Sequence, residues 1–194
     1  MLGLGGGLTG GAALDSVVTP DSVSDLAFWF KNSTGVEVHR WTDSSGNSNH
    51  MNQTDEELQA SVDSGGLLFV DDESHHYDLT TAVDIGASNP FTMIIVAYLE
   101  SYDSQNCILG DNNNAAIFLE FQQTNQMRYR QSGTAAVLKF GGTNHFATDE
   151  KMMITMTKDT SRNLVVYKNG NVLTQTSSTG VPVASGVFGC DQVG

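Results

Sequence analysis

The segment that decides the fold is FTMIIVAYL, residues 91–99. It is rich in β-branched and aromatic residues, which pack well on the pleated surface of a sheet. Its nine residues lie between Asn89-Pro90 and the polar stretch that starts at Glu100. The segment therefore predicts a β-strand, and it is the strongest strand signal in the chain.

Shorter β-like patterns recur on both sides of this segment. They lie at residues 26–30, 37–41, 67–70, 115–121, 126–131, 135–140, 152–158, 164–168 and 172–176. In 152–158, alternation places Met152, Ile154 and Met156 on one face and two threonines on the other. Asn169-Gly170 separates the last two segments, and Asn-Gly between apolar runs is typical of a β-hairpin.

Helical spacing is nearly absent, because only residues 55–60 suggest a single helical turn. Many short strands joined by Gly, Asn, Asp and Ser turns indicate an all-β protein, and we expect an antiparallel jelly-roll sandwich. A chain of 194 residues can bury about 70% of its surface, enough for one core. We therefore expect one sandwich domain over residues 23–194, preceded by an arm over residues 1–22.

The predicted arm begins MLGLGGGLTGG, with six glycines in eleven residues. Such glycine density favours an extended chain, and the segment lacks the basic start and apolar core of a secretory signal. Leu2, Leu4 and Leu8 nevertheless give the arm apolar side chains to bury. An arm that cannot fold alone but carries leucines is a candidate assembly contact that becomes ordered against a neighbour.

The chain is strongly acidic, with 22 Asp and Glu against 9 Lys and Arg and a net charge of −13. This argues against a nucleic-acid partner, which requires a basic footprint. No apolar run approaches the ~20 residues of a membrane span, so we expect no membrane contact. Residues 1–100 hold 15 acidic and 2 basic side chains, which indicates either a solvated face or a docking face for a cation or basic partner.

Catalytic patterns are missing, so we expect no enzyme and no cofactor. Glycoside hydrolysis needs two carboxylates at a fixed separation, whereas Glu120 stands alone in FLEFQQ. The Gly-x-Ser-x-Gly turn of serine hydrolases is also absent from the sequence. Cys107 and Cys190 both lie in apolar surroundings, and we expect both to be buried free thiols.

Calcium is a weaker alternative, since it takes six to eight oxygen ligands from Asp, Asn and carbonyl groups. Two runs, residues 43–49 and 111–114, offer such oxygens at alternating positions. The metal candidates in them are Asp43, Asn47, Asn49, Asp111 and Asn113. Asx turns explain both runs without a metal, and we favour that interpretation. Trp29 and Trp41 are expected to fill the core.

The order of several motifs resembles the laminin-G-like, concanavalin A-type lectin/glucanase domains. The matching stretches are LAFWF (26–30), WTDSSGNSNH (41–50), GLLFVDDESHHYDL (66–79), NPFTMIIVAYLE (89–100) and YKNG (167–170). The resemblance covers residues 26–189 and implies a concanavalin A-like jelly roll. It also implies a final strand that this chain either lacks or takes from a neighbour. A glycine-rich arm before such a domain resembles structural proteins of tailed phages.

Two functional hypotheses follow from these patterns. The first is a non-enzymatic virion structural protein, a capsid decoration or appendage subunit that assembles with other virion proteins through its arm. The second is a lectin-like carbohydrate-binding module that mediates adhesion to host-surface glycans. We expect the protein to be located in the virion, or otherwise outside the cell or at its surface.

Overall fold

The computed structural model describes residues 19–70, 73–85, 89–101, 105–113, 118–122, 126–130, 137–142, 145–179 and 188–194. These residues form an all-β structure, as predicted, and its helical part consists of two short 3-10 turns. The turns are η1 (Pro20–Ser22) and η2 (Glu56–Leu58). Asp55 caps η2 by accepting a hydrogen bond from the Glu57 N–H, so the helical turn expected at residues 55–60 is confirmed.

Sixteen strands are formed by the described residues. In the first half they are β1 (Val36–Glu37), β2 (Arg40–Trp41), β3 (Met51–Asn52), β4 (Ser61–Asp63), β5 (Gly66–Leu68), β6 (Tyr77–Ile85) and β7 (Phe91–Tyr98). In the second half they are β8 (Gln105–Gly110), β9 (Phe118–Gln122), β10 (Gln126–Arg130), β11 (Val137–Gly141), β12 (Lys151–Lys158), β13 (Leu164–Lys168), β14 (Asn171–Val172), β15 (Gln175–Thr179) and β16 (Phe188–Val193).

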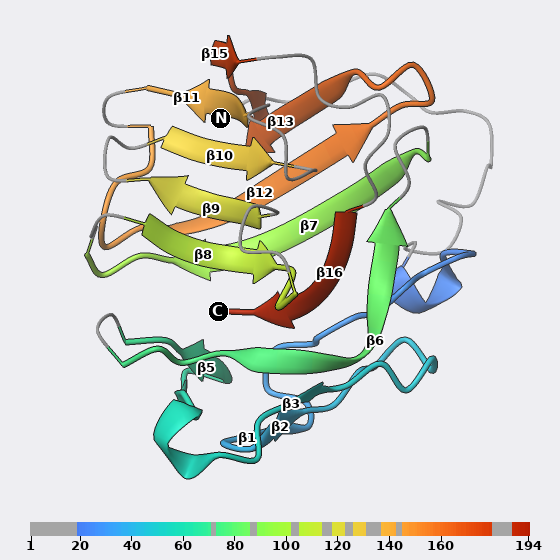
Figure 1. Cartoon of the computed structure of the whole chain (residues 1–194), viewed down its shortest axis with the longest axis vertical. Helices are drawn as coiled ribbons and strands as arrows, with labels where there is room; N and C mark the ends of the chain where they lie inside the picture. Colours follow the sequence, from blue (N-terminus) through green and yellow to red (C-terminus); the bar gives the residue numbers. More distant parts are fainter. Residues whose placement is uncertain are drawn as a thin grey trace, which may run out of the picture.

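The strands form two main antiparallel sheets and a small hairpin (Figure 1). The larger sheet has the order β1-β2-β3-β6-β16-β8-β9-β10-β11-β15, and the four-stranded sheet has the order β14-β13-β12-β7. β4 and β5 pair only with each other among the described strands. In Figure 1 the strands β8 to β10 lie in front of β7 and β12, an arrangement consistent with a β-sandwich.

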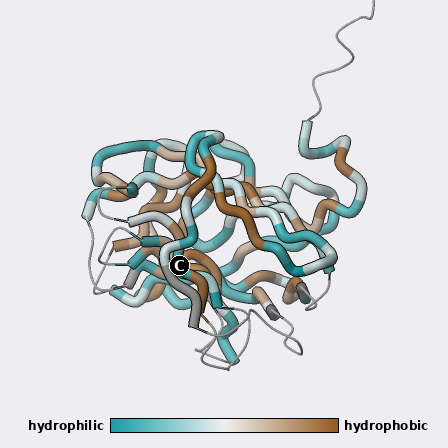
Figure 2. The backbone as a smooth tube through the Cα atoms, turned by 90° about the horizontal axis from the view of Figure 1, so that it is seen from above, coloured by the Kyte–Doolittle hydropathy of each residue, from teal (hydrophilic) through white to brown (hydrophobic). Residues whose placement is uncertain are grey.

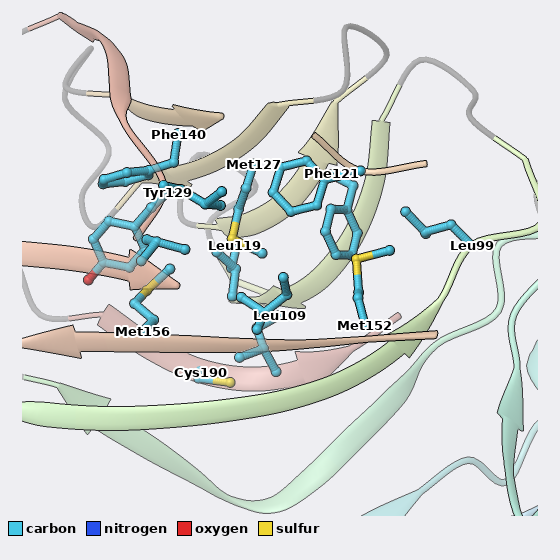
Figure 3. Close-up of a cluster of buried hydrophobic side chains, with 14 of the residues drawn as sticks. Leu99, Leu109, Leu119, Phe121, Met127, Tyr129, Phe140, Met152, Met156 and Cys190 are labelled. Atoms are coloured by element: carbon cyan, nitrogen blue, oxygen red, sulfur yellow. The ribbon is translucent and has the colours of Figure 1, made fainter. Parts of the chain in front are cut away.

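The core lies between the two main sheets. Figure 3 shows Leu119, Phe121, Met127 and Tyr129 of the larger sheet packed against methionines of the four-stranded sheet. Met152, Ile154 and Met156 are buried on one face of β12, as their alternation predicts. The tube in Figure 2 shows that hydrophobic stretches run through the interior of the fold.

Within the described chain, no helix is long and apolar enough to cross a membrane.

The predicted Asn-Gly hairpin is confirmed. β13 and β14 pair with Lys168 opposite Asn171, and Asn169 and Gly170 form the two-residue turn between them. Both turn residues have positive φ, 50° and 81°, as the favoured hairpin turn requires. Asn169 also accepts a hydrogen bond from the Met153 N–H at 2.8 Å, which ties the turn to β12.

The structure departs from the sequence-based prediction at several segments. Residues 26–30 form no strand, because the backbone of Trp29 bonds instead to the Asp43 side chain and to the Ser44 N–H. Residues 37–41 form not one strand but the turn and ends of the short β1–β2 hairpin. The patterns did not predict β6 and β8. β16 occupies an interior position of the larger sheet, between β6 and β8.

Some expected core residues are less buried than predicted. Trp41 is only partly buried, although it packs against the core. Trp29 is also half-buried, and the Lys31 ammonium lies 5.4 Å from the centre of its ring. Both cysteines are free thiols, as expected. Cys190 is buried, whereas Cys107, which lies opposite Glu120 of β9, is exposed.

Candidate functional site

The Asp43 side chain is at the centre of the loop over residues 43–49, which the sequence analysis named as a candidate metal site. Its carboxylate accepts hydrogen bonds from the backbone N–H groups of Trp29 at 2.8 Å, Ser45 at 2.8 Å and Asn49 at 3.0 Å. The Ser45 hydroxyl donates a fourth at 2.7 Å. Burial raises the pKa of the Asp43 carboxyl, but these donors outweigh it and bring the pKa below its ordinary value of 3.8. The Asp43 carboxylate therefore fixes the conformation of the loop over residues 43–49 and ties it to Trp29.

The two asparagines of this loop connect it to other segments. The Asn47 amide donates a hydrogen bond to the Leu26 carbonyl oxygen. The Asn49 side-chain oxygen accepts a hydrogen bond from the Thr81 N–H on β6, at 2.8 Å. Three of the four donors to Asp43 and the donor to Asn49 are thus backbone N–H groups, and the bond from the Ser45 N–H to Asp43 is the local contact of an Asx turn.

The second candidate run lies beside β16. Asp111 accepts a hydrogen bond from the Asn113 N–H at 2.8 Å, which is a local Asx turn. Asp191, which the sequence analysis did not single out, accepts one from the Asn112 N–H at 2.7 Å. Its partner lies 79 positions away in the chain, so only the folded sheet reveals this contact. Among the described residues, no three His, Cys, Asp or Glu side chains are grouped as metal ligands.

Glu120 lies on the side of the larger sheet opposite the core. It forms an ion pair with Arg128, its cross-strand neighbour on β10, and Arg128 in turn lies opposite Lys139 on β11. Burial raises the pKa of the Glu120 carboxyl despite these two positive charges. This arrangement is a cross-strand ion pair and differs from the two carboxylates that glycoside hydrolysis requires.

The clearest candidate for a functional surface is the outward side of the four-stranded sheet, here called the apolar face. Its exposed large apolar side chains are those of Ile94, Val96, Tyr98, Met153 and Val172. Ile94 and Val96 have 63% and 66% of their surface exposed, although they lie in the middle of a long strand. The register places Thr92, Lys151, Thr155, Thr157, Val165 and Tyr167 on the same side. A patch of this kind typically marks an interaction site.

The position of β7 explains how the apolar face arises. β7 alternates between half-buried and exposed residues, so its inward positions pack on the core and its outward positions form the face. Both sets are apolar, which is unusual for a strand with one solvated side. β7 is also an edge strand, since β12 is its only partner among the described strands. The stretch FTMIIVAYL contains both apolar sets, but a strand pattern alone does not tell which side of the sheet stays exposed.

One end of the apolar face carries both acidic and basic side chains. The Tyr98 hydroxyl donates a hydrogen bond to the Asp149 carboxylate at 3.1 Å. This bond, together with the charges of Asp149 and Glu100, raises the pKa of Tyr98. Lys151 lies directly opposite Tyr98 on β12. The face therefore has an apolar middle and a charged rim at one end.

The arm residues Leu2, Leu4 and Leu8, which the sequence analysis singled out as an assembly contact, lie outside the described residues. The loop candidates Asp43, Asn47 and Asn49 belong to the connection between β2 and β3, whereas Asp111 and Asn113 belong to a separate turn near β16. The structure therefore does not bring these two candidate metal runs into one site.

Comparison with known proteins finds no match for this chain among protein-family models, curated proteins or solved structures.

Proposed function

We propose that this chain is a non-enzymatic structural subunit of a tailed-phage virion, either a capsid decoration protein or an appendage subunit. It assembles with neighbouring virion proteins through its N-terminal arm, with Leu2, Leu4 and Leu8 as contacts, and through the apolar face. We also propose that its sheets form a concanavalin A-like jelly roll, as the motif order suggests.

The observation that carries the proposal is the apolar face. Exposure of apolar side chains such as Ile94 and Val96 to water is unfavourable by about 25 cal/mol for each Å² of apolar surface, compared with burial. A soluble acidic protein that keeps several of them together on one sheet is suited to a permanent or repeated contact. The charge pattern agrees with this role, since the acidic first half favours a neighbour with a basic surface.

The experiment is incorporation into particles. Tagged copies are expressed during virion production, and the copies in purified particles are quantified. Deletion of residues 1–15 should abolish incorporation, while the unfolding free energy stays nearly unchanged because the proposal assigns the contacts of the arm to a neighbouring protein. The double variant Ile94→Thr with Val96→Thr should also be depleted. A protein that is missing from purified particles, or variants that incorporate at the wild-type level, would contradict the proposal.

A carbohydrate-binding module is the second candidate, and the exposed ring of Tyr98 favours it. Tyr98 is 49% exposed and lies at the polar end of the apolar face. Aromatic side chains with one apolar and one polar edge suit contacts that are partly wet. Host-surface glycans would be the ligands in this case. Binding to a glycan array that is lost in Tyr98→Ala, together with wild-type particles that lack the protein, would favour this function over the first.

A further inference from the structure

We infer that the apolar face is the contact between two copies of this chain, stacked face to face about a twofold axis. This inference names the partner of that face and rests on the proposed function only for the use of the dimer in an assembly. It requires that each copy present a surface that is complementary to itself, because the two halves of a twofold interface are the same patch.

The charge pattern on the apolar face is compatible with a second copy as its occupant. Two chains of net charge −13 repel each other over most of their surfaces. The apolar face is a region where that repulsion is locally absent, since its eleven register positions include no Asp or Glu and one lysine, Lys151. A basic partner would find no carboxylate in the middle of this face, whereas a second apolar face finds a matching surface.

The rim supplies the polar complement. Lys151 and Tyr98 lie side by side at one end of the face, and Asp149 and Glu100 lie next to Tyr98. Around a twofold axis that runs along the strands, this end of one copy meets the same end of the other. Lys151 of each copy then faces the acidic rim of its partner, so each contact is made twice.

The size of the face sets the expected strength. β7 and β12 have eight residues each and β13 has five. At ~3.3 Å per residue and ~4.8 Å between strands, they present roughly 400 Å² of sheet. That is about half of the ~800 Å² per partner that a typical stable interface buries. We therefore expect a weak, reversible dimer with a Kd of roughly 10–500 µM, which close placement in a particle would strengthen.

The test is sedimentation of the full chain from about 5 µM to about 1 mM, in ~50 and ~500 mM NaCl. The dimer fraction should rise with concentration and also with salt, because salt screens the repulsion between two acidic copies. Association that weakens as salt increases, or a chain that stays monomeric over the whole range, would overturn the inference.

Variants locate the contact. Ile94→Thr with Val96→Thr keeps the β-branched shape that suits a strand but removes apolar surface, and should raise the Kd at least ~10-fold. Val38→Thr with Val62→Thr is the matched control, since Val38 is 49% exposed in the β1–β2 turn and Val62 is 43% exposed on β4, both away from the apolar face. It should leave the Kd unchanged. Circular dichroism melts of both variants establish that they fold, and a dimer unaffected by the first pair would refute this face as the contact.

The dimer and the proposed function can fail separately. If the wild-type chain is monomeric but the Ile94/Val96 variant is lost from particles, another virion protein occupies the face, and only the dimer is wrong. If the dimer forms and requires Ile94 and Val96, yet the variant enters particles normally, the dimer stands and the face has no role in assembly.

Discussion

Replacement of Asp43 by Asn tests whether one buried carboxylate holds the loop over residues 43–49. The substitution keeps the shape of the side chain but converts one acceptor oxygen into an NH2 donor. One oxygen of Asp43 accepts the Trp29 and Ser45 N–H groups, and the other accepts the Ser45 hydroxyl and the Asn49 N–H. The remaining oxygen of an asparagine can still accept the Trp29 and Ser45 N–H groups, and the Ser45 hydroxyl can rotate to accept a hydrogen bond from the new NH2 group. The Asn49 N–H then faces a donor.

The magnitude follows from these contacts. A buried donor left without a partner costs ~1–3 kcal/mol, and the remaining hydrogen bonds lose the extra ~1 kcal/mol that a charged acceptor provides. Asn49 is buried, so water cannot easily replace the lost partner. We therefore expect Asp43→Asn to lower the unfolding free energy by about 2–4 kcal/mol at pH 7.

Urea unfolding followed by tryptophan fluorescence is the suitable assay, because Trp29 bonds directly to Asp43. Asp55→Asn is the matched control. Asp55 is an exposed cap of η2, and asparagine caps equally well, so this change should cost less than ~0.5 kcal/mol. A cost below ~1 kcal/mol for Asp43→Asn would refute the role assigned to the carboxylate.

The pH dependence gives a second check on the same residue. The hydrogen bonds lower the pKa of Asp43 in the folded state below the ordinary value of 3.8. The ionised carboxylate therefore contributes stability that is fully present above the unfolded pKa and is lost as the pH falls through the folded pKa. The difference between wild type and Asp43→Asn should be constant from about pH 5 to 8 and shrink below about pH 4. A difference that grows on acidification would contradict this sign.

Three further outcomes are expected. Gly65→Ala should destabilise more than Gly170→Ala in urea unfolding. Both glycines have φ of 81°, but only at Gly65 would the added carbon clash with the Ser33 side chain, and equal losses would refute this. Phe146→Ala should lower the free energy of unfolding by ~3–5 kcal/mol, and Phe91→Ala by less, because Phe146 is fully buried and Phe91 only partly buried. A larger loss for Phe91→Ala would contradict this assignment of the core. EDTA should leave the melting temperature unchanged, and a fall of many degrees would instead indicate a bound metal ion.

Much of the fold could be predicted from local pattern. FTMIIVAYL and the alternating methionines of residues 152–158 became β7 and β12 with nearly the expected ends. The Asn169-Gly170 turn formed as predicted, because both residues tolerate positive φ. These signals are local: strand propensity and turn conformation depend on neighbouring residues in the chain.

Other elements depended on distant contacts. Residues 26–30 are as apolar and aromatic as a strand, yet the Asp43 loop takes the backbone hydrogen bonds of Trp29. β6 and β8 carry polar residues within weak patterns, and they become strands because β16 lies between them. No local signal shows that the last segment of a chain will pair with strands about 80 and 110 positions earlier.

Local patterns were enough to predict that the protein is all-β, that Met152, Ile154 and Met156 lie on one face of a strand, and that Asn169-Gly170 turns a hairpin. Which apolar residues remain in water depends instead on how the strands pack in three dimensions. Ile94 and Ile95 are adjacent and chemically identical, but one is exposed on the apolar face and the other packs against the core. The physical reason is that a strand points successive side chains to opposite sides, and the sheet on the second side is missing among the described residues.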